Sequence, residues 1–313
     1  MISIFYGTRP EYIKLLPVYK ELYGTEVELV QVAQHTTLLE GAHYDRKVTI
    51  SNTPNRLSSI VGSILIEEPF LPDTSLVVVQ GDTASAYGVA LAAYHAEIPI
   101  AHVEAGLRTY GAMPFPEEFY RRSISLMASL HFAPTELDYN NLRLEKLQGL
   151  IKITGNTVAD SLPVLPIEYG PEVLITLHRR ETDQEKLALF LDDYFFGTSY
   201  KPIIIEHPGH PLPPLKMEKS PPLPREEVLK ILARCHCVIT DSGGLQEEAA
   251  FYKKKTIVCR EATERPSVYT TFHLDFSTID APYPYGDGLA SMRIAYDLRT
   301  YKKPDSFRFS QIR

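Results

Sequence analysis

Three acidic side chains stand where the chain leaves short apolar runs, and acids in such places can transfer protons. Asp82 lies in QGDT (80–83), Glu104 follows the next apolar run, and Glu117 lies in PFPEE (114–118). Taken singly, Asp82 also suits a helix N-cap and Glu117 the first turn of a helix. Taken together, they predict carboxylates from three successive βα junctions at one edge of a sheet. Clustered carboxylates raise one another's pKa toward the range useful for general acid–base chemistry.

Other strings combine glycine, serine and cationic side chains, which together suit phosphate groups. Arg9 lies in GTRPE (7–11), where a turn leads into a helix. An arginine there adds its charge to the backbone N–H groups and dipole of the helix start, so it favours an anion. In TDSGGLQEE (240–248), Ser242 and two glycines let N–H groups approach phosphate oxygens, and Glu248 could accept both hydroxyls of a ribose.

Two further strings add candidate anion contacts. HRRET (178–182) offers His178 and two arginines, and TERP (263–266) offers Arg265. The sequence contains neither GxGxxG nor GxxxxGK[ST], so dinucleotide and P-loop sites lose support. An anion-binding helix start in each of two domains predicts instead a nucleotide-type ligand in the cleft between them.

The elements that must position these residues follow an alternating pattern. Continuous apolar runs separated by helices indicate a parallel sheet covered on both faces, and right-handed crossovers make it doubly wound. In the first half, the expected strands are Ile2–Tyr6, Val27–Ala33, Ser75–Val79, Pro99–Val103, Leu130–Ala133 and Leu150–Ile153. The expected helices lie near Pro10–Leu22, Leu57–Glu67, Thr83–His95, Pro116–Ser129 and Thr135–Leu147.

A proline-rich interruption, Leu162–Pro171, separates this pattern from a second one, and we interpret it as an interdomain linker. The second series is expected to contain strands Val173–Leu177, Pro202–Glu206, Cys237–Thr240 and Thr256–Cys259 and helices near Gln184–Phe195, Arg225–Arg234 and Leu245–Tyr252. We therefore expect an N-terminal Rossmann-like domain over 1–162 and a second over 163–288. A helix in 289–313 could complete the first domain.

Composition excludes several classes of protein. The 313 residues include 32 Lys and Arg and 39 Asp and Glu, which gives a net charge of −7. This charge argues against nucleic-acid binding through bulk positive charge. No apolar run reaches the roughly 18 residues of a membrane span. Three cysteines give no even disulfide framework, which favours a reducing, cytoplasmic setting. His207 and His210 lack a third ligand at an evident spacing, so no metal is expected.

In their order along the chain, these motifs resemble those of the non-hydrolysing UDP-N-acetylglucosamine 2-epimerases. The matching strings cover nearly the whole chain, and as an ordered set they are highly specific. They are GTRPEYIK (7–14), AQH (33–35), QGDT (80–83), HVEAGLRT (102–109), PFPEE (114–118), FAPTE (132–136), ITGNTVAD (153–160), HRRET (178–182), TDSGGLQEEA (240–249), TERP (263–266) and PYGDG (284–288).

The resemblance implies an α/β protein of the GT-B fold, with two Rossmann-like doubly wound domains facing an interdomain cleft that binds a UDP-sugar. It implies interconversion of UDP-GlcNAc and UDP-ManNAc through anti elimination of UDP and a 2-acetamidoglucal, with no redox cofactor, no metal and commonly a homodimer. By resemblance, the catalytic residues are Asp82, Glu104, Glu117 and His178. The substrate-binding residues are Arg9, Lys14, Arg179, His207, Ser242, Gly243, Gly244, Glu248 and Arg265.

Departures from the family pattern keep three other functions open. The chain is shorter than is usual in the family, mainly in the second domain. A retaining GT-B glycosyltransferase shares the fold, a hydrolysing epimerase would release free ManNAc and UDP, and an inactive relative could serve as a UDP-sugar sensor. The retained carboxylates and His178 favour the epimerase, because binding alone would not require them.

Overall fold

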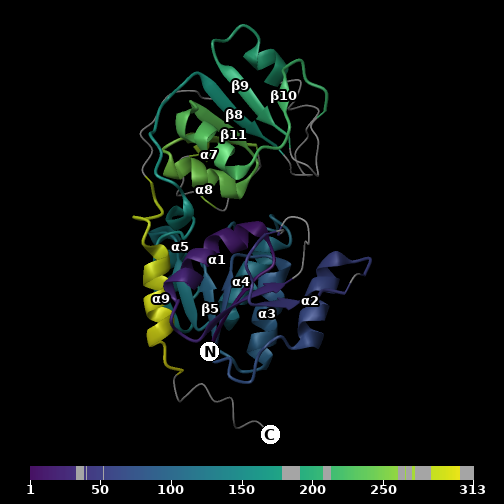
Figure 1. Ribbon diagram of the computed structural model, residues 1–313, viewed down its shortest axis with the longest axis vertical. Helices are drawn as coiled ribbons and strands as arrows, with labels where there is room; N and C mark the ends of the chain where they lie inside the picture. Colours follow the sequence, from purple (N-terminus) through teal and green to yellow (C-terminus); the bar gives the residue numbers. More distant parts are fainter. Residues whose placement is uncertain are drawn as a thin grey trace. The chain divides into compact units, whose positions relative to one another are not determined.

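The computed structural model describes residues 1–32, 39, 41–51, 53–177, 191–206, 213–259, 265, 270–271 and 283–303. The chain forms two compact units. Unit 1 comprises Met1–Ser161 and Gly286–Arg313, and unit 2 comprises Leu162–Tyr285. The C-terminal segment therefore returns to the unit in which the chain begins, and Figure 1 shows its helix, drawn in yellow, alongside that unit.

Unit 1 is built on a parallel sheet whose order, in the described residues, is β3-β2-β1-β4-β5-β6-β7. Its strands are β1 (Ile2–Tyr6), β2 (Val27–Val32), β3 (Arg46–Val48), β4 (Leu76–Gln80), β5 (Ile100–Val103), β6 (Leu130–Ala133) and β7 (Leu150–Ile153). Its helices are α1 (Arg9–Glu21), α2 (Arg56–Glu67), α3 (Ala84–His95), α4 (Glu117–Met127), α5 (Glu136–Leu144), the 3₁₀ turn η1 (Ala159–Ser161) and α9 (Ala290–Thr300).

Helices cover both faces of this sheet, which explains the continuous apolar character of its strands. Along β1, Phe5 packs into the core formed with α2, α3 and α4, while Ile4 and Tyr6 pack into the core formed with α1 and α9. The alternation of side chains along a strand thus supplies both layers. The sheet order reverses direction between β1 and β4, and ligands bind at such switch points, outside the carboxyl ends of the strands.

Unit 2 repeats the design with the order β10-β9-β8-β11-β12-β13, again all parallel in the described residues. Its elements are β8 (Glu172–Thr176), β9 (Lys201–Ile205), β10 (Lys219–Ser220), α7 (Arg225–Arg234), β11 (Cys237–Thr240), α8 (Gly243–Phe251), β12 (Lys255–Val258) and β13 (Thr270–Thr271). Val173, Ile175 and Ile239 lie in its core, and the switch point lies between β8 and β11.

Most elements expected from the sequence are present within one or two residues of their predicted ends. Strands β3, β10 and β13 were not predicted, because each is only two or three residues long and two of them contain lysine or arginine. The helix expected near Gln184–Phe195 lies largely outside the described residues. Across the described part of the chain, no helix combines the length and apolar character needed to cross a membrane.

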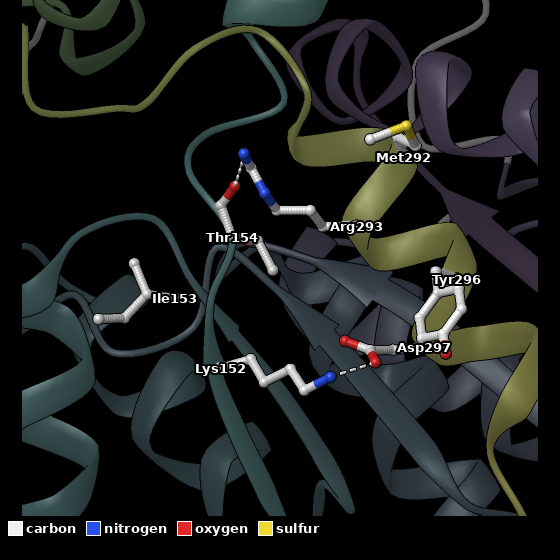
Figure 2. Close-up of a pocket in the computed structure, with 7 residues that line it drawn as sticks. All are labelled: Lys152, Ile153, Thr154, Met292, Arg293, Tyr296 and Asp297. Atoms are coloured by element: carbon white, nitrogen blue, oxygen red, sulfur yellow. Dashed lines mark hydrogen bonds and ion pairs between the residues drawn. The ribbon is translucent and has the colours of Figure 1, made fainter.

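A cavity of about 340 Å³ lies in unit 1 beside β7 (Figure 2). It is lined by Lys152, Ile153, Thr154, Met292, Arg293, Tyr296 and Asp297. Lys152 is paired with Asp297, and Arg293 donates to the Thr154 carbonyl oxygen at 3.1 Å and to Asp287 at 2.8 Å. The cavity lies where α9 packs beside β7. None of the site residues predicted from the sequence lines it.

Replacing Ile294 by alanine tests how strongly α9 stabilises unit 1. Ile294 is fully buried against the core that contains Leu15 and Val18 of α1. We expect a loss of about 2–5 kcal/mol in the free energy of unfolding, measured by urea denaturation, because the cavity left behind adds to the lost burial. Met292→Ala is the control, because Met292 is 48% exposed on the same helix and should change stability by less than about 0.5 kcal/mol. Equal effects of the two substitutions would contradict the assignment of α9 to this core.

Candidate active site

The turn after β1 is organised by a reciprocal cap at the start of α1. Thr8 is the N-cap, and its hydroxyl accepts a hydrogen bond from the Glu11 backbone N–H at 3.5 Å. The Glu11 carboxylate reaches back and accepts from the Gly7 backbone N–H at 3.0 Å. This arrangement is a variant of the capping box, because the carboxylate binds the N–H of the residue before the N-cap. Arg9 lies exposed in the first turn of the helix. The predicted anion contact thus stands at a helix start at the sheet's switch point.

Glu11 also joins this turn to the next one across the switch point. Its second carboxylate oxygen accepts from the Thr83 hydroxyl at 2.8 Å, and Thr83 caps α3. The Glu11 side chain is buried, and this burial raises its pKa to about 6. Glu11 was not among the residues predicted from the sequence, although the T-x-x-E spacing of residues 8–11 is the signal that could have identified it.

Lys14 lies one turn further along α1 and pairs with Glu104, which follows β5. Both side chains are only 7% exposed. Glu104 has a φ of 63°, a left-handed conformation that is uncommon for a residue other than glycine. Backbone in this region is strained and persists where its surroundings hold it, often at functional sites. The structure therefore brings a predicted binding residue and a predicted catalytic residue into direct contact.

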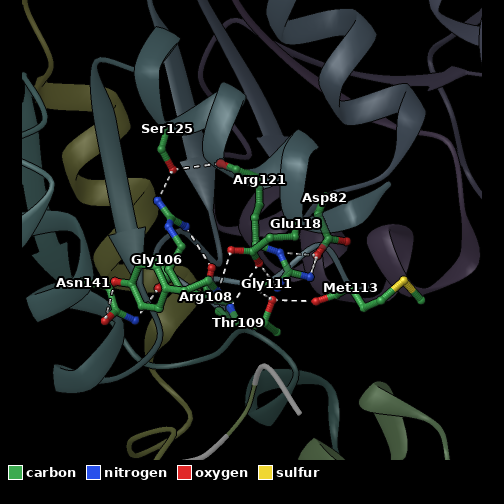
Figure 3. A network of polar contacts seen from close by, with 12 residues as sticks. Asp82, Gly106, Arg108, Thr109, Gly111, Met113, Glu118, Arg121, Ser125 and Asn141 are labelled. Carbon is green, nitrogen blue, oxygen red and sulfur yellow. Dashed lines mark hydrogen bonds and ion pairs between the residues drawn. The ribbon is translucent and has the colours of Figure 1, made fainter. Parts of the chain in front are cut away.

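Asp82 is held by an arginine that the sequence analysis did not identify. Arg121, on α4, donates its Nε to the Asp82 carboxylate at 2.9 Å and its Nη1 to Glu118 at 3.2 Å (Figure 3). Asp82 is not the N-cap of α3, as the sequence had allowed, because Thr83 takes that position and accepts from the Ala86 N–H at 3.1 Å. The Asp82 side chain is 26% exposed. Because it is not used as a helix cap, its carboxylate could contact a ligand.

The two acids at the start of α4 have different surroundings. Glu118 is buried and accepts hydrogen bonds from the backbone N–H groups of Thr109 and Tyr110, both at 3.1 Å. It therefore fixes the loop between β5 and α4, whereas its neighbour Glu117 is half-buried. The expectation of three separate βα junctions was wrong, because Glu104 and Glu117 open and close this one loop. The candidate carboxylates come from two junctions.

Polar contacts outside the candidate residues hold the loop in place. The Asn141 amide donates to the Gly106 carbonyl oxygen at 2.9 Å and accepts from the Tyr110 hydroxyl at 3.1 Å (Figure 3). Gly106 has a φ of 99°, and a Cβ there would lie 2.3 Å from the Asp138 carbonyl oxygen, so only glycine can occupy the position. Loop geometry around the carboxylates is thus set in advance of any ligand.

His102 fixes the other junction from the adjacent strand. Burial lowers its pKa to about 3, so the ring is neutral at physiological pH. Its Nε2 lies 2.8 Å from the Gly81 carbonyl oxygen, which can only accept, so Nε2 carries the proton. The turn that carries Asp82 is therefore tied to β5 as well as to α1 and α4. Two carboxylates held in this way, each beside a cation, can exchange protons with a bound molecule.

In unit 2, the predicted anion contacts gather at the start of α8. Ser242 is its N-cap and accepts from the Leu245 N–H at 3.4 Å, and the first turn carries no acidic side chain. Gly244 is exposed, and a Cβ built on it would meet no atom nearer than the Ser242 hydroxyl oxygen, at 4.0 Å. Gly243 begins the helix and is buried. Such a helix start is suited to binding a phosphate.

Two further candidates of unit 2 are held by ion pairs. Arg265 donates its Nε to Glu247 at 2.6 Å, and Glu248 accepts from Arg225 on α7. Both Glu247 and Arg225 escaped the sequence analysis. Three predicted residues, His178, Arg179 and His207, lie outside the described residues, so the structure does not bear on their roles.

The raised pKa of Glu11 predicts a specific pH dependence of stability. With a pKa near 6 in the folded state and 4.5 as the ordinary value, the folded state binds more protons than the unfolded state between these values. Stability from this group is therefore fully present below pH 4.5 and falls by about 2 kcal/mol as the pH rises past 6. In Glu11→Gln that fall should vanish, so its stability relative to wild type should rise between pH 4 and pH 7.

Urea denaturation at several pH values measures this difference. Glu21→Gln, an exposed glutamate at the end of the same helix, is the control and should follow the wild type. A constant difference between Glu11→Gln and wild type across this range would contradict the buried, titrating carboxyl.

Comparisons with known proteins agree with this geometry. A sequence profile of the UDP-N-acetylglucosamine 2-epimerase family matches residues 23–274. The UDP-N-acetylglucosamine 2-epimerase of Bacillus subtilis is 32% identical over 376 aligned residues, covering 98% of each chain. That alignment is longer than the 313 residues here, which confirms that this chain is the shorter one.

Solved structures lead to the same family. The UDP-GlcNAc 2-epimerase of Neisseria meningitidis, bound to UDP-GlcNAc, superposes with a TM-score of 0.81 at 28% identity, covering 96% of this chain and 99% of that chain. The S. aureus MnaA–UDP co-structure gives a TM-score of 0.80 at 28% identity, covering 97% of this chain and 98% of that chain. These likenesses confirm the α/β GT-B fold expected from the sequence. The chain therefore belongs to the UDP-N-acetylglucosamine 2-epimerase family.

Proposed function

We propose that this protein is a non-hydrolysing epimerase that interconverts UDP-GlcNAc and UDP-ManNAc. The observation that carries the proposal is the set of acids beside β4 and β5, in a chain whose family is established. Asp82 is oriented by Arg121, Glu104 by Lys14, and Glu117 begins the helix that supplies Arg121. Inversion at C2 of a sugar requires acid–base groups on both faces of the ring, and one carboxylate could not supply both.

The proposed reaction proceeds by elimination and re-addition. A carboxylate removes the C2 proton, the C2–H electron pair forms the C1=C2 bond, and the C1–O bond breaks so that UDP leaves with its electron pair. UDP then adds again to C1 of the 2-acetamidoglucal while C2 receives a proton from the opposite face. The balance is an isomerisation with no net water, electron or cofactor. A hydrolysing epimerase would instead capture the intermediate with water.

Some of the candidate binding residues would contact the diphosphate of the substrate, and another would contact its ribose. In unit 2, the Ser242–Gly244 helix start offers N–H groups to the diphosphate. In unit 1, Arg9 at the start of α1 is the candidate cation for an anionic group. Arg265, only 10% exposed and held by Glu247, would contribute a fixed positive charge. Glu248 would accept ribose hydroxyls. Developing negative charge on the departing UDP is stabilised by donors that are already oriented, which is how such sites lower a barrier.

A proton NMR time course in D₂O tests the proposed function directly. UDP-GlcNAc is incubated with the purified protein without acceptor or metal. We expect UDP-ManNAc to appear with deuterium at C2, because the proton removed there exchanges with solvent. Free sugar and UDP released in equal amounts would identify a hydrolysing enzyme. No new sugar would favour a glycosyltransferase or a UDP-sugar sensor.

Removing each candidate acid should lower turnover, and Glu104→Gln should also lower stability, because it takes the carboxylate away from buried Lys14. Asp82→Asn, Glu104→Gln and Glu117→Gln should each lower kcat by about 10²–10⁴-fold, because each removes a proton-transfer group. Steady-state kinetics measures the loss, and thermal melts verify folding. Glu145→Gln is a control, since Glu145 accepts two hydrogen bonds from buried Arg108 and has no proposed chemical role. Equal losses of UDP affinity and kcat at Glu117 would contradict its catalytic role.

Gly244→Ala separates ligand binding from stability. Helices favour alanine over glycine by up to about 1 kcal/mol, so the melting temperature should stay level or rise. The added methyl group would stand between a phosphate and the N–H groups of the helix start, and we expect UDP to bind at least about tenfold more weakly by calorimetry. Gly62→Ala is the matched control, because Gly62 lies in α2 with nothing within 4 Å of an added Cβ. Unchanged UDP affinity in Gly244→Ala would exclude the phosphate site.

We further propose that the protein is a homodimer. On α4, Phe119 and Leu126 are 61% and 76% exposed and, seven residues apart, share a face of the helix. Light scattering after size-exclusion chromatography should give twice the chain mass, and Leu126→Glu should shift the protein toward the monomer. A wild-type monomer at assay concentration would reject this assignment.

We also propose a cytoplasmic location, because Cys235, Cys237 and Cys259 are all free thiols in the structure. Cell fractionation followed by thiol labelling of the unfolded protein should recover it in the cytoplasmic fraction with three reactive thiols. Recovery in an oxidising compartment would refute the location.

A further inference from the structure

Arg225 and Glu248 form the ion pair that links α7 to α8. The Nε and Nη2 groups of Arg225 donate to the same carboxylate oxygen, Oε1 of Glu248, at 3.1 and 2.8 Å. Both side chains are largely shielded, with 27% and 16% of their surfaces exposed. Two N–H groups of one planar guanidinium converge on this oxygen and hold it in place, which restricts the conformations open to the Glu248 side chain.

The helix that carries Arg225 gives no reason for a cation there. Arg225 is the first residue of α7, where the helix dipole disfavours positive charge. The two residues that follow, Glu226 and Glu227, have the sign that the dipole favours. Pro224 is the N-cap and makes no side-chain hydrogen bond, and Arg225 cannot cap the helix in its place, because arginine has no acceptor for the free N–H groups. Its contact with Glu248 is the interaction that accounts for an arginine at this position.

Glu248 lies on the same face of α8 as the exposed Gly244. Residues four apart in a helix are neighbours on its surface, at a rise of about 1.5 Å per residue. A ligand whose phosphate meets the N–H groups around Gly244 would therefore extend along this face toward Glu248, about one helical turn away. Phosphate and ribose of a nucleotide are separated on this scale. Glu248 is oriented by Arg225 at the place where the ribose would arrive.

We propose that Arg225 is a positioning residue that holds the Glu248 carboxylate in the orientation that accepts ribose hydroxyl groups. This inference rests on the proposed function, because it takes Glu248 as the ribose contact. A free glutamate side chain must be ordered when it binds a ligand, and that loss of freedom opposes binding. An ion pair that orders the side chain beforehand removes this penalty. Arg225 thereby sets how strongly the site distinguishes a ribose from a sugar without hydroxyls.

Calorimetric titration with two ligands tests this role. UDP carries both ribose hydroxyls, and 2′,3′-dideoxy-UDP lacks them. The wild type should bind UDP at least about tenfold more tightly than the dideoxy compound, because hydrogen bonds to a charged group are strong. Arg225→Met should weaken UDP by at least about fivefold and change the affinity for dideoxy-UDP by less than about twofold. Arg225→Lys keeps the charge but not the planar guanidinium, so its affinity for UDP should lie between those of the wild type and Arg225→Met.

The double variant Arg225→Met/Glu248→Gln identifies the route of the effect. It should match Glu248→Gln alone for both ligands, because Arg225 acts only through the carboxylate. Arg234→Met is the matched control, since Arg234 lies on the same helix, 3.9 Å from Glu172, and should preserve the preference for ribose.

Equal weakening of UDP and dideoxy-UDP in Arg225→Met would overturn the proposal in favour of a direct phosphate contact or a structural role. So would unchanged UDP affinity in that variant. A wild type that turns over UDP-GlcNAc but binds both nucleotides equally would overturn the ribose role while the epimerase assignment stands. A wild type without turnover that still prefers UDP over dideoxy-UDP, with the preference lost in Arg225→Met, would reject the epimerase and retain this inference.

Discussion

Helix α1 holds the edge of the first sheet together through two charged side chains that point inward. Glu11 binds the turn after β4 through Thr83, and Lys14, one helical turn later, binds Glu104 after β5. Because residues three apart share a helix face, both contacts are made by one side of one rigid element. Burying these charges is unfavourable unless each is satisfied by a partner, so displacement of any one turn would leave a charged group uncompensated. The positions of the candidate acids follow from this constraint.

Both units contain shielded ion pairs, but they carry different groups at their candidate sites. In unit 1, carboxylates and cations are paired within the protein, as in the contacts of Arg121 with Asp82 and Glu118. In unit 2, the start of α8 presents an exposed glycine, a serine cap and no acidic side chain in the first turn. The first arrangement suits proton transfer, because the acids are held in fixed orientations. The second suits an anion, because helix N–H groups and dipole act together. A reaction that moves a proton and releases a diphosphate requires both.

Much of the fold could be predicted because its signals are local. Apolar runs such as Ile2–Tyr6 and Cys237–Thr240 form strands with the expected ends, and the all-parallel order follows from the intervening helices. The motif strings also predicted the family, since their residues keep a fixed order along the chain. Short polar strands such as β3 were missed, because their pairing with a longer neighbour, and not their composition, makes them strands.

The sequence by itself determined which acids, glycines and caps the chain offers, because helix caps and strand ends depend on residues a few positions apart. Only the tertiary structure decided which cation meets which acid. Lys14 and Glu104 are 90 positions apart, and Asp82 and Arg121 are 39 apart. These pairs form because parallel strands bring distant turns to one edge, a result of sheet order that no local pattern contains. The same reason separates Glu118 from its neighbour Glu117. Both lie in the first turn of α4, but only the tertiary structure buries Glu118 and gives it a structural role.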